Sequence, residues 1–427
     1  MQVLLAILTA IAPPAVAEKL LVSICLLALP LCARCAVTAI RPDAGAVALL
    51  TLPLAFSQPM AMGFYGFSLS LSLFLLTVGL WLRRAEKGGW RVASALGGLS
   101  LLLYFAHPIG LLAAWISIAA ISLGRGGAVI ARAAIASLPT AALSLWYAAQ
   151  ERGGSSGMAP FGPALRRLVT ADTLVPFDDS WRWLAWTTVA LFAVLLVVRV
   201  AERRRDPQDL WLGVLGLLVG LYFIMPDTTA GGSFISARLA LICFFPAMMW
   251  LASGSGSRAV RRLTVTGAVL IALAGAAQQA ATATAISARI DAIAQVGASV
   301  EPGSTVLTLT LDYTPGSSKS RPMLHAGGYV TSARRAIALD SYQAACGLFP
   351  VRYRESVDPF PTLLGLERPY DTPRKVDPDR YPGRVDYVLI LGRDESAPWW
   401  PELAEVLKRS YTRVRESDGA RLWRRAW

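Results

Sequence analysis

Long apolar runs separated by short polar loops fill the first 285 residues of the chain. The run Val92–Leu123 is broken once, at His107-Pro108. A bilayer core needs about 20 apolar helical residues and tolerates about 17, so this run is too long for one crossing and suits two. Proline lacks a backbone donor and disfavours helix in the residue before it. The pattern therefore predicts a helical hairpin that turns at His107.

Lysine and arginine orient this hairpin. Six of them flank its two outer ends, namely Arg83, Arg84, Lys87, Arg91, Arg125 and Arg132. Positive charge beside membrane segments marks the cytoplasmic side, so we expect His107 to face outward.

The same pattern predicts ten crossings along the chain. We place them at about residues 17–33, 44–57, 60–82, 92–106, 108–123, 127–148, 182–199, 208–225, 236–252 and 262–284. The predicted inner loops carry 15 lysine and arginine residues and the outer ones six, which supports the orientation. The first crossing then runs inward, which leaves Met1–Ala12 as an expected interfacial helix on the outer face. Because bacterial polytopic proteins usually begin inside, we also expect the reading frame to start late, after one upstream crossing.

The composition of the chain changes at about Ile286. From there on, charged residues are more frequent and the apolar runs are only as long as a strand. The sequence thus predicts a transmembrane helical domain over 1–285 and an extracytoplasmic α/β domain over 286–427. Within the second domain, buried strands are expected at 306–311 and 385–391. A terminal hairpin is expected at 411–415 and 421–424, after a short helix at 401–409.

Composition agrees with a polytopic membrane protein, since 55% of the residues are hydrophobic, 16% are charged and the mean hydropathy is +0.49. The net charge of +13 lies mostly before Ile286, where cytoplasmic loops require it, and basic tracts with interleaved aromatics are missing, so no nucleic-acid partner is expected. Two histidines exclude a histidine-rich metal site. No acidic residue falls in the middle of a predicted crossing, which argues against a proton-driven carrier.

Several polar residues on the predicted outer face can carry chemistry, and each has a simpler explanation. His107 is either a catalytic group or an interfacial helix cap. Arg238 either binds phosphate or reaches toward the headgroups. Asp178 and Asp179 offer a base, although helix capping explains either one more simply. Asp227, beside a proline, is a site carboxylate or a turn former.

Short motifs along the chain resemble bacterial membrane proteins of the GT-C type. They are Ala17-Glu18-Lys19-Leu20, Gly63 to Leu69, Arg83-Arg84, Tyr104 to Pro108, Gly232 to Arg238-Leu239 and Gly347 to Tyr353. The resemblance implies a mainly α, polytopic helix bundle in the bacterial inner membrane with a periplasmic domain. It also implies a polyprenyl-phosphate-linked sugar as substrate and an active site at the outer membrane surface.

The resemblance also assigns residues. The donor-phosphate arginine of the family maps by position to Arg238, and Tyr65, Arg166 and Arg167 are the other expected substrate-binding residues. The catalytic acid of the family lies in the first outer loop, and the resemblance implies that this chain begins inside that loop. The chain has no carboxylate before Glu18. Either a missing segment carries the acid, or Glu18 or a later residue (His107, Asp178, Asp179 or Asp227) substitutes for it, or the protein is not catalytic.

Three functions follow from this resemblance. The leading one is a membrane glycosyltransferase that uses a polyprenyl-phosphate sugar at the periplasmic face, with membrane lipid and the lipid-linked sugar as its partners. The second is an inactive GT-C-like scaffold of an envelope-polysaccharide assembly, and the third is a carrier for a lipid-linked glycan. No cofactor is expected, and a requirement for a divalent metal is left open.

Overall fold

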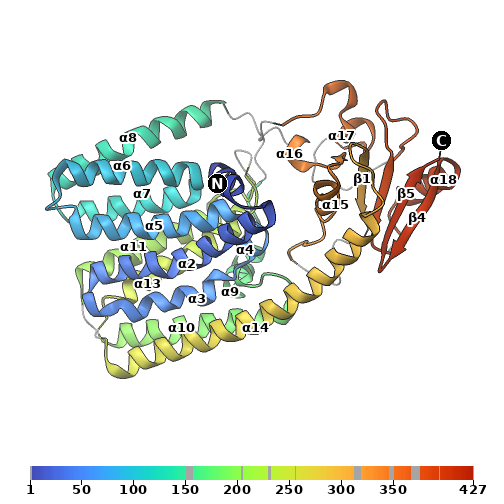
Figure 1. The fold of residues 1–427 in the computed structure, drawn as a ribbon. Coiled ribbons are helices and arrows are strands. Elements are labelled where there is room, and N and C mark those ends of the chain that lie inside the picture. Colours follow the sequence, from blue (N-terminus) through green and yellow to red (C-terminus); the bar gives the residue numbers. More distant parts are fainter. Residues whose placement is uncertain are drawn as a thin grey trace. The chain divides into compact units, whose positions relative to one another are not determined.

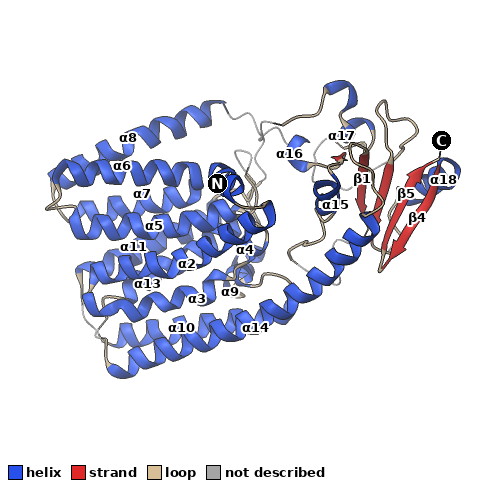
Figure 2. Cartoon of the chain, viewed as in Figure 1, coloured by secondary structure: helices blue, strands red, loops and turns tan. Residues whose placement is uncertain are grey.

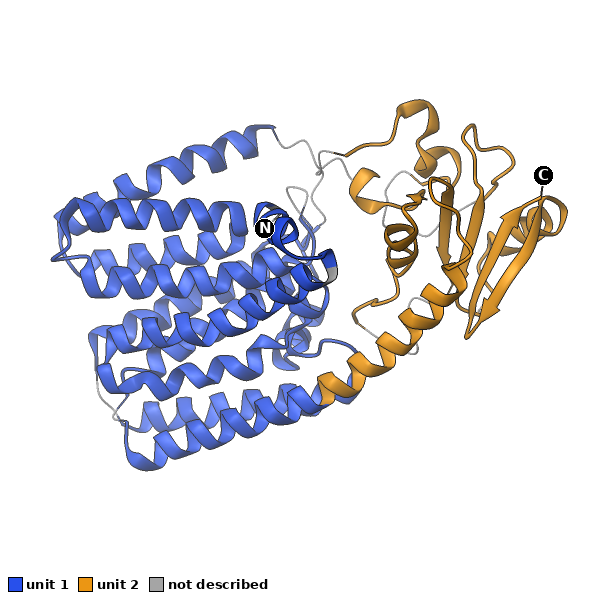
Figure 3. Cartoon of the chain, viewed as in Figure 1, with its two compact units in different colours: residues 1–277 blue, residues 278–427 orange. Residues whose placement is uncertain are grey.

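The computed structural model describes residues 2–150, 157–202, 205–228, 232–254, 256–311, 319–345, 351–366, 376–393 and 395–426 (Figure 1). The chain forms two compact units, residues 1–277 and residues 278–427 (Figure 3). The described part of the first unit is built of helices, and the five strands of the described residues all lie in the second (Figure 2).

The first unit is a bundle of apolar helices. Its helices are α1 (Gln2–Ile11), α2 (Pro14–Ile40), η1 (Pro42–Thr51), α3 (Leu52–Ala55), α4 (Gln58–Ala61), α5 (Tyr65–Arg84), α6 (Gly89–Ala106), α7 (Pro108–Leu123), α8 (Gly127–Gln150), α9 (Phe161–Val169), η2 (Asp172–Leu174), η3 (Asp179–Trp181), α10 (Arg182–Ala201), η4 (Pro207–Asp209), α11 (Leu210–Ile224), α12 (Ile235–Ile242), α13 (Phe244–Leu251) and α14 (Arg258–Gly297). The last of these, α14, begins in the first unit and ends in the second.

Seven helices among the described residues are long and apolar enough to cross a membrane. They are Val16–Ile40, Tyr65–Arg84, Gly89–Ala106, Gly127–Gln150, Asp179–Ala201, Pro207–Ile224 and Arg258–Gly297. The chain therefore has the helices of a multi-pass membrane protein, as its apolar pattern predicts. Three further predicted segments are shorter apolar helices, Pro42–Ala55, Pro108–Leu123 and Ile235–Leu251. The mainly helical, membrane-type fold is confirmed, whereas the count of ten crossings and the GT-C arrangement stay predictions.

The turn at His107 lies where the sequence predicts it. Helix α6 ends at Ala106, α7 begins at Pro108, and His107 between them has extended backbone angles. Proline is well suited to the first helical position, where its missing N–H would have no intrahelical partner. Phe67, near the start of α5, packs its ring edge-on against His107, and α12 contacts α7. We call this end of the bundle the His107 end (Figure 1).

The first residues form the predicted helix, α1. Its Leu8 packs against Ala17 and Leu21 of α2, while Val3 and Ile11 are exposed. An apolar outer surface on a short helix is typical of a segment at a membrane interface. The helix is confirmed, and its placement on the outer face stays a prediction.

Helix α5 is the best-buried of the long apolar helices. A Cβ added at Gly79 would lie 3.0 Å from the Cα of Ala36, so a glycine lets α5 approach the backbone of α2 closely. The side chains of Phe74 and Trp81, both in α5, are fully buried. The Trp81 indole Nε1 donates a hydrogen bond to Ser122 Oγ of α7 at 2.9 Å.

The second unit contains a five-stranded sheet with the order β2-β1-β3-β5-β4. Its strands are β1 (Thr305–Thr310), β2 (Ile337–Ala338), β3 (Tyr387–Leu391), β4 (Tyr411–Ser417) and β5 (Ala420–Arg425). Strand β1 runs parallel to β2 and β3, and β5 runs antiparallel to β3 and β4. The two predicted buried strands and the terminal hairpin are confirmed, whereas the two-residue strand β2 is too short to leave a sequence pattern.

Helices cover both faces of this sheet. They are α15 (Gly327–Arg334), α16 (Tyr342–Ala345), η5 (Glu355–Val357), α17 (Pro359–Thr362) and α18 (Trp400–Ser410). Val306 and Leu389 face the end of α14 and α15, while Leu307 and Val388 face α17 and α18. Alternate strand residues point to opposite faces, which explains why both strands read as continuous apolar runs.

Asp340, just after β2, gives the second unit a pH-dependent stability. Its Oδ1 is buried without a hydrogen-bond partner among the described residues, and burial raises the pKa of this carboxyl from 3.8 to about 6. The folded protein holds this proton more tightly than the unfolded chain does, so the contribution to stability falls as pH rises from about 4 to about 6. We expect Asp340→Asn to raise the thermal unfolding midpoint of the full chain at about pH 7 and to leave it unchanged at about pH 4. An equal shift at both pH values would contradict this origin.

Candidate functional site

The start of α12 is held in place by Asp227. Its Oδ1 accepts hydrogen bonds from the backbone N–H of Ser236 at 3.0 Å and from Ser236 Oγ at 2.5 Å. Phe234, the residue just before α12, has a left-handed backbone (φ 58°). This conformation costs a bulky residue about 1 kcal/mol or more. Thr173 Oγ1 donates to the carbonyl of Ala237 at 2.7 Å. These contacts fix the first turn of α12 and with it Arg238.

Arg238 is a buried cation at the His107 end. Only 6% of the residue is exposed, and its guanidinium carbon lies 4.2 Å from the ring centre of Phe64 and 5.9 Å from that of Phe67. Within the described ranges its Nε has no hydrogen-bond partner, and no carboxylate there lies at ion-pair distance. Asp227 is the carboxylate whose charge acts on it from farther away.

The energetics leave this arginine under-compensated. A desolvated cation–π contact stabilises by about 2 kcal/mol. Removing a charged group from water costs several kcal/mol, which is normally offset by a hydrogen-bonded counter-ion. The two phenylalanine rings and the distant Asp227 supply no such hydrogen bonds. An anion bound to the guanidinium would complete the site, because arginine donates in a planar fork that matches carboxylate and phosphate oxygens.

His107 lies beside this arginine as a neutral imidazole. Its Nδ1 accepts a hydrogen bond from the backbone N–H of Ile109 at 3.2 Å, which caps the start of α7. Its ring packs edge-on against Phe67 with the ring centres 5.4 Å apart. Burial, reinforced by the positive charge of Arg238, lowers the pKa of His107 to about 3. With Nδ1 acting as acceptor the proton sits on Nε2, so His107 presents a neutral N–H donor.

Glu18 and Tyr65 also come together. The Tyr65 hydroxyl donates to Glu18 Oε1 at 3.4 Å, and Glu18 is exposed to solvent. Tyr65 begins α5 two residues before Phe67, so this pair shares a helix start with the aromatic contacts of Arg238. Glu18 is thus a carboxylate that solvent or a substrate can reach.

The two adjacent aspartates are engaged locally. Asp178 caps η3 by accepting from the backbone N–H of Ser180 at 2.9 Å. Asp179 accepts from Arg182 Nη2 at 2.7 Å, and Arg182 also reaches Asp172 at 3.1 Å. These contacts match the capping explanation for Asp178, and the catalytic role of either residue stays a prediction.

Arg166 and Arg167 are exposed on α9. The Tyr222 hydroxyl at the end of α11 donates to the carbonyl of Ala164 at 2.7 Å, which ties α9 to the bundle. Helix α9 contacts η2, which in turn contacts α12. Helix α9 is thus linked to α12 through η2, and no described contact joins either arginine to Arg238.

No protein-family model, curated protein or solved structure matches this chain. What the Arg238 site binds therefore has to follow from its own chemistry. Among the described residues, no three histidine, cysteine, aspartate or glutamate side chains group together where they could hold a metal ion. The first residues of the expected Gly347–Tyr353 motif, 347–350, lie outside the described residues.

Sequence reasoning identified Arg238, Asp227 and His107 separately but missed what joins them. Phe64 and Phe67, which pack on Arg238, stand inside the Gly63 to Leu69 motif. Ser236, two residues before Arg238, is the hydroxyl that Asp227 holds. A serine close to the arginine and an aromatic pair after a glycine were the available signals.

Proposed function

We propose that the protein is a GT-C-like membrane protein that binds a polyprenyl-phosphate-linked sugar, with the phosphate on Arg238 at the outer ends of the helices. The observation that carries the proposal is the buried Arg238 guanidinium, which lacks an anionic partner in the described part of the chain. A lipid phosphate supplies that anion and, unlike a soluble one, reaches the site from the bilayer. The arginine bias of the opposite loops, from which the sequence predicts that His107 faces outward, supports this placement.

The same residues suit an inverting glycosyl transfer. An acceptor hydroxyl attacks the anomeric carbon of the sugar, and the bond from that carbon to the phosphate oxygen breaks. The polyprenyl phosphate leaves with the electron pair, so negative charge grows next to Arg238, where the low dielectric strengthens its stabilisation. His107 Nε2–H can donate to a phosphate or hydroxyl oxygen. Glu18, the exposed carboxylate, would accept the proton of the acceptor.

A non-enzymatic scaffold is the second candidate. Asp178, Asp179 and Asp227 are each engaged in a cap or an ion pair, which leaves fewer carboxylates ready to act as a base. A scaffold would keep lipid-phosphate recognition and lack transfer.

Two measurements on the purified full chain test this proposal. In a detergent titration, polyprenyl phosphate should bind at least about tenfold more tightly than the uncharged polyprenol of the same length, because a charge-assisted hydrogen bond contributes about 1.5–3 kcal/mol. Equal affinities would contradict a phosphate site. Release of polyprenyl phosphate from the lipid-linked sugar, with loss of release in Glu18→Gln, would identify the enzyme, whereas binding without release would identify the scaffold.

A further inference from the structure

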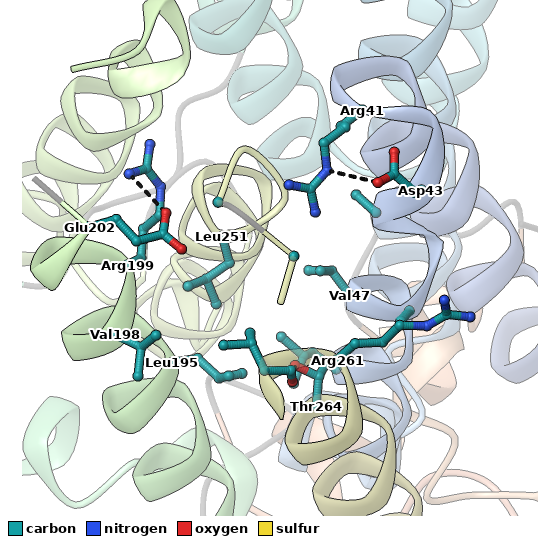
Figure 4. A pocket seen from close by; sticks show the side chains of 16 residues that line it. Arg41, Asp43, Val47, Leu195, Val198, Arg199, Glu202, Leu251, Arg261 and Thr264 are labelled. Carbon is teal, nitrogen blue, oxygen red and sulfur yellow. Dashed lines mark hydrogen bonds and ion pairs between the residues drawn. The ribbon is translucent and has the colours of Figure 1, made fainter. Parts of the chain in front are cut away.

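A pocket lies in the first unit at the end of the bundle opposite His107. It is formed where α2, α10 and α13 end and where η1 and α14 begin, and it is open to solvent, with a cavity volume of about 40 Å³ (Figure 4). This end carries the arginine-rich loops that the sequence assigns to the cytoplasmic face.

One arginine of the pocket is part of its frame. Arg199 is 4% exposed and lies 3.6 Å from Glu202 and 3.9 Å from Asp209. Its Nη2 donates to Ser253 Oγ at 3.1 Å, and its guanidinium stacks over the Trp250 ring at 5.1 Å. These contacts use its charge to join α10 to α13, so Arg199 forms a wall of the pocket.

Two other arginines of the pocket, Arg41 and Arg261, have no close, buried carboxylate among the described residues. The Nε of Arg41 is buried without a hydrogen-bond partner among the described residues, and its nearest carboxylate, Asp43, is 77% exposed at 3.9 Å. Gly256, with φ +65°, makes room for this side chain, since a Cβ there would lie 2.5 Å from Arg41 Nη2. Arg261, in the first turns of α14, is exposed at the same pocket and makes no ion pair within the described ranges.

The rest of the pocket is apolar. Val47 of η1, Leu195 and Val198 of α10, and Leu251 of α13 line it (Figure 4). A small inorganic anion would gain nothing from these walls. A molecule with a phosphate and a hydrocarbon chain would use both parts of the pocket, because apolar burial and arginine–phosphate hydrogen bonds are separate contributions.

We propose that this pocket binds an anionic phospholipid, with its phosphate on Arg41, an acyl chain against the apolar wall and the exposed Arg261 as a further positive charge at the rim of the pocket. The cytoplasmic leaflet is rich in anionic lipids, which basic residues near its surface attract. The site is distinct from the Arg238 site in residues, in end of the bundle and in ligand, so either can fail without the other.

Lipid titration of the full chain in detergent tests this site. The probes are phosphatidylglycerol, phosphatidylcholine with the same acyl chains, and inorganic phosphate, each followed by native mass spectrometry and by the thermal unfolding midpoint. We expect phosphatidylglycerol to bind at least about tenfold more tightly than phosphatidylcholine, and Arg41→Ala and Arg261→Ala each to weaken it by about tenfold. Arg132→Ala removes a partly buried arginine outside the pocket and should leave phosphatidylglycerol binding unchanged.

Three results would overturn the proposal. They are equal binding of the two lipids, unchanged phosphatidylglycerol binding in Arg41→Ala/Arg261→Ala, and inorganic phosphate that binds as tightly as the lipid. The last result would assign the arginines to a free phosphate. If Arg41→Ala fails to fold, the exposed Arg261→Ala variant still decides the question.

Discussion

Replacing Arg238 by alanine is expected to weaken polyprenyl-phosphate binding by about a hundredfold, equivalent to about 3 kcal/mol. The guanidinium is buried over two phenylalanine rings, so the phosphate would be its hydrogen-bonding counter-ion. Without it the phosphate would be desolvated at the site and gain no partner. Affinity measured by titration of the purified full chain in detergent gives the result directly.

Two controls separate this role from a structural one. Arg238→Lys keeps the charge but loses the planar fork, and we expect it to lose about tenfold in affinity. In the absence of ligand Arg238→Ala should unfold no more easily than the wild type, because it removes a buried charge without a hydrogen-bonded carboxylate. A marked loss of stability with unchanged affinity for the remaining folded protein would assign Arg238 to packing.

Replacing Trp81 by alanine is expected to give the largest loss of stability, about 3–5 kcal/mol. The side chain is fully buried in α5, and its indole Nε1 donates to Ser122 Oγ of α7 at 2.9 Å. Removal would leave a buried cavity between the ends of α5 and α7, and it would also remove the hydrogen bond. Denaturant titration in mixed micelles, followed by circular dichroism, measures the change in the free energy of unfolding.

The chain offers matched controls for this experiment. Trp90 of α6 is 62% exposed, so Trp90→Ala should stay within about 0.5 kcal/mol of the wild type. Trp81→Phe keeps most of the buried volume and isolates the hydrogen bond, worth about 1 kcal/mol. Equal losses for Trp81→Ala and Trp90→Ala would show that burial at α5 does not decide stability.

The sequence predicts the helices of the first unit well because their signals are local. An apolar run and a proline such as Pro108 act within one or two turns. The end of α14 was predicted at about residue 284, whereas the helix continues to Gly297. A fall in hydropathy ends a membrane segment, but it does not end a helix. The alanine-rich stretch that follows keeps its helical propensity until a glycine interrupts it.

The site could be predicted only in part, since its chemistry depends on packing between distant segments. The sequence indicates Arg238 as a candidate, because it is a charged residue that follows a glycine-rich turn at the start of an apolar segment. That Phe64 would pack over its guanidinium depends on how α5 meets α12, which no local pattern reveals. The Asp178 cap, by contrast, joins residues only two positions apart, so the sequence alone suggests it.

The cap that His107 makes at α7 has a consequence for acidic surroundings. The His107 imidazole accepts a backbone hydrogen bond at Nδ1 and is shielded from water, and its pKa is lowered to about 3. It therefore stays neutral when the pH falls to mildly acidic values. His107 then adds no positive charge beside Arg238 at a pH where an ordinary surface histidine would be protonated. If Arg238 binds an anion, as proposed, protonation of His107 would not alter the affinity of the site for that anion between neutral and mildly acidic pH.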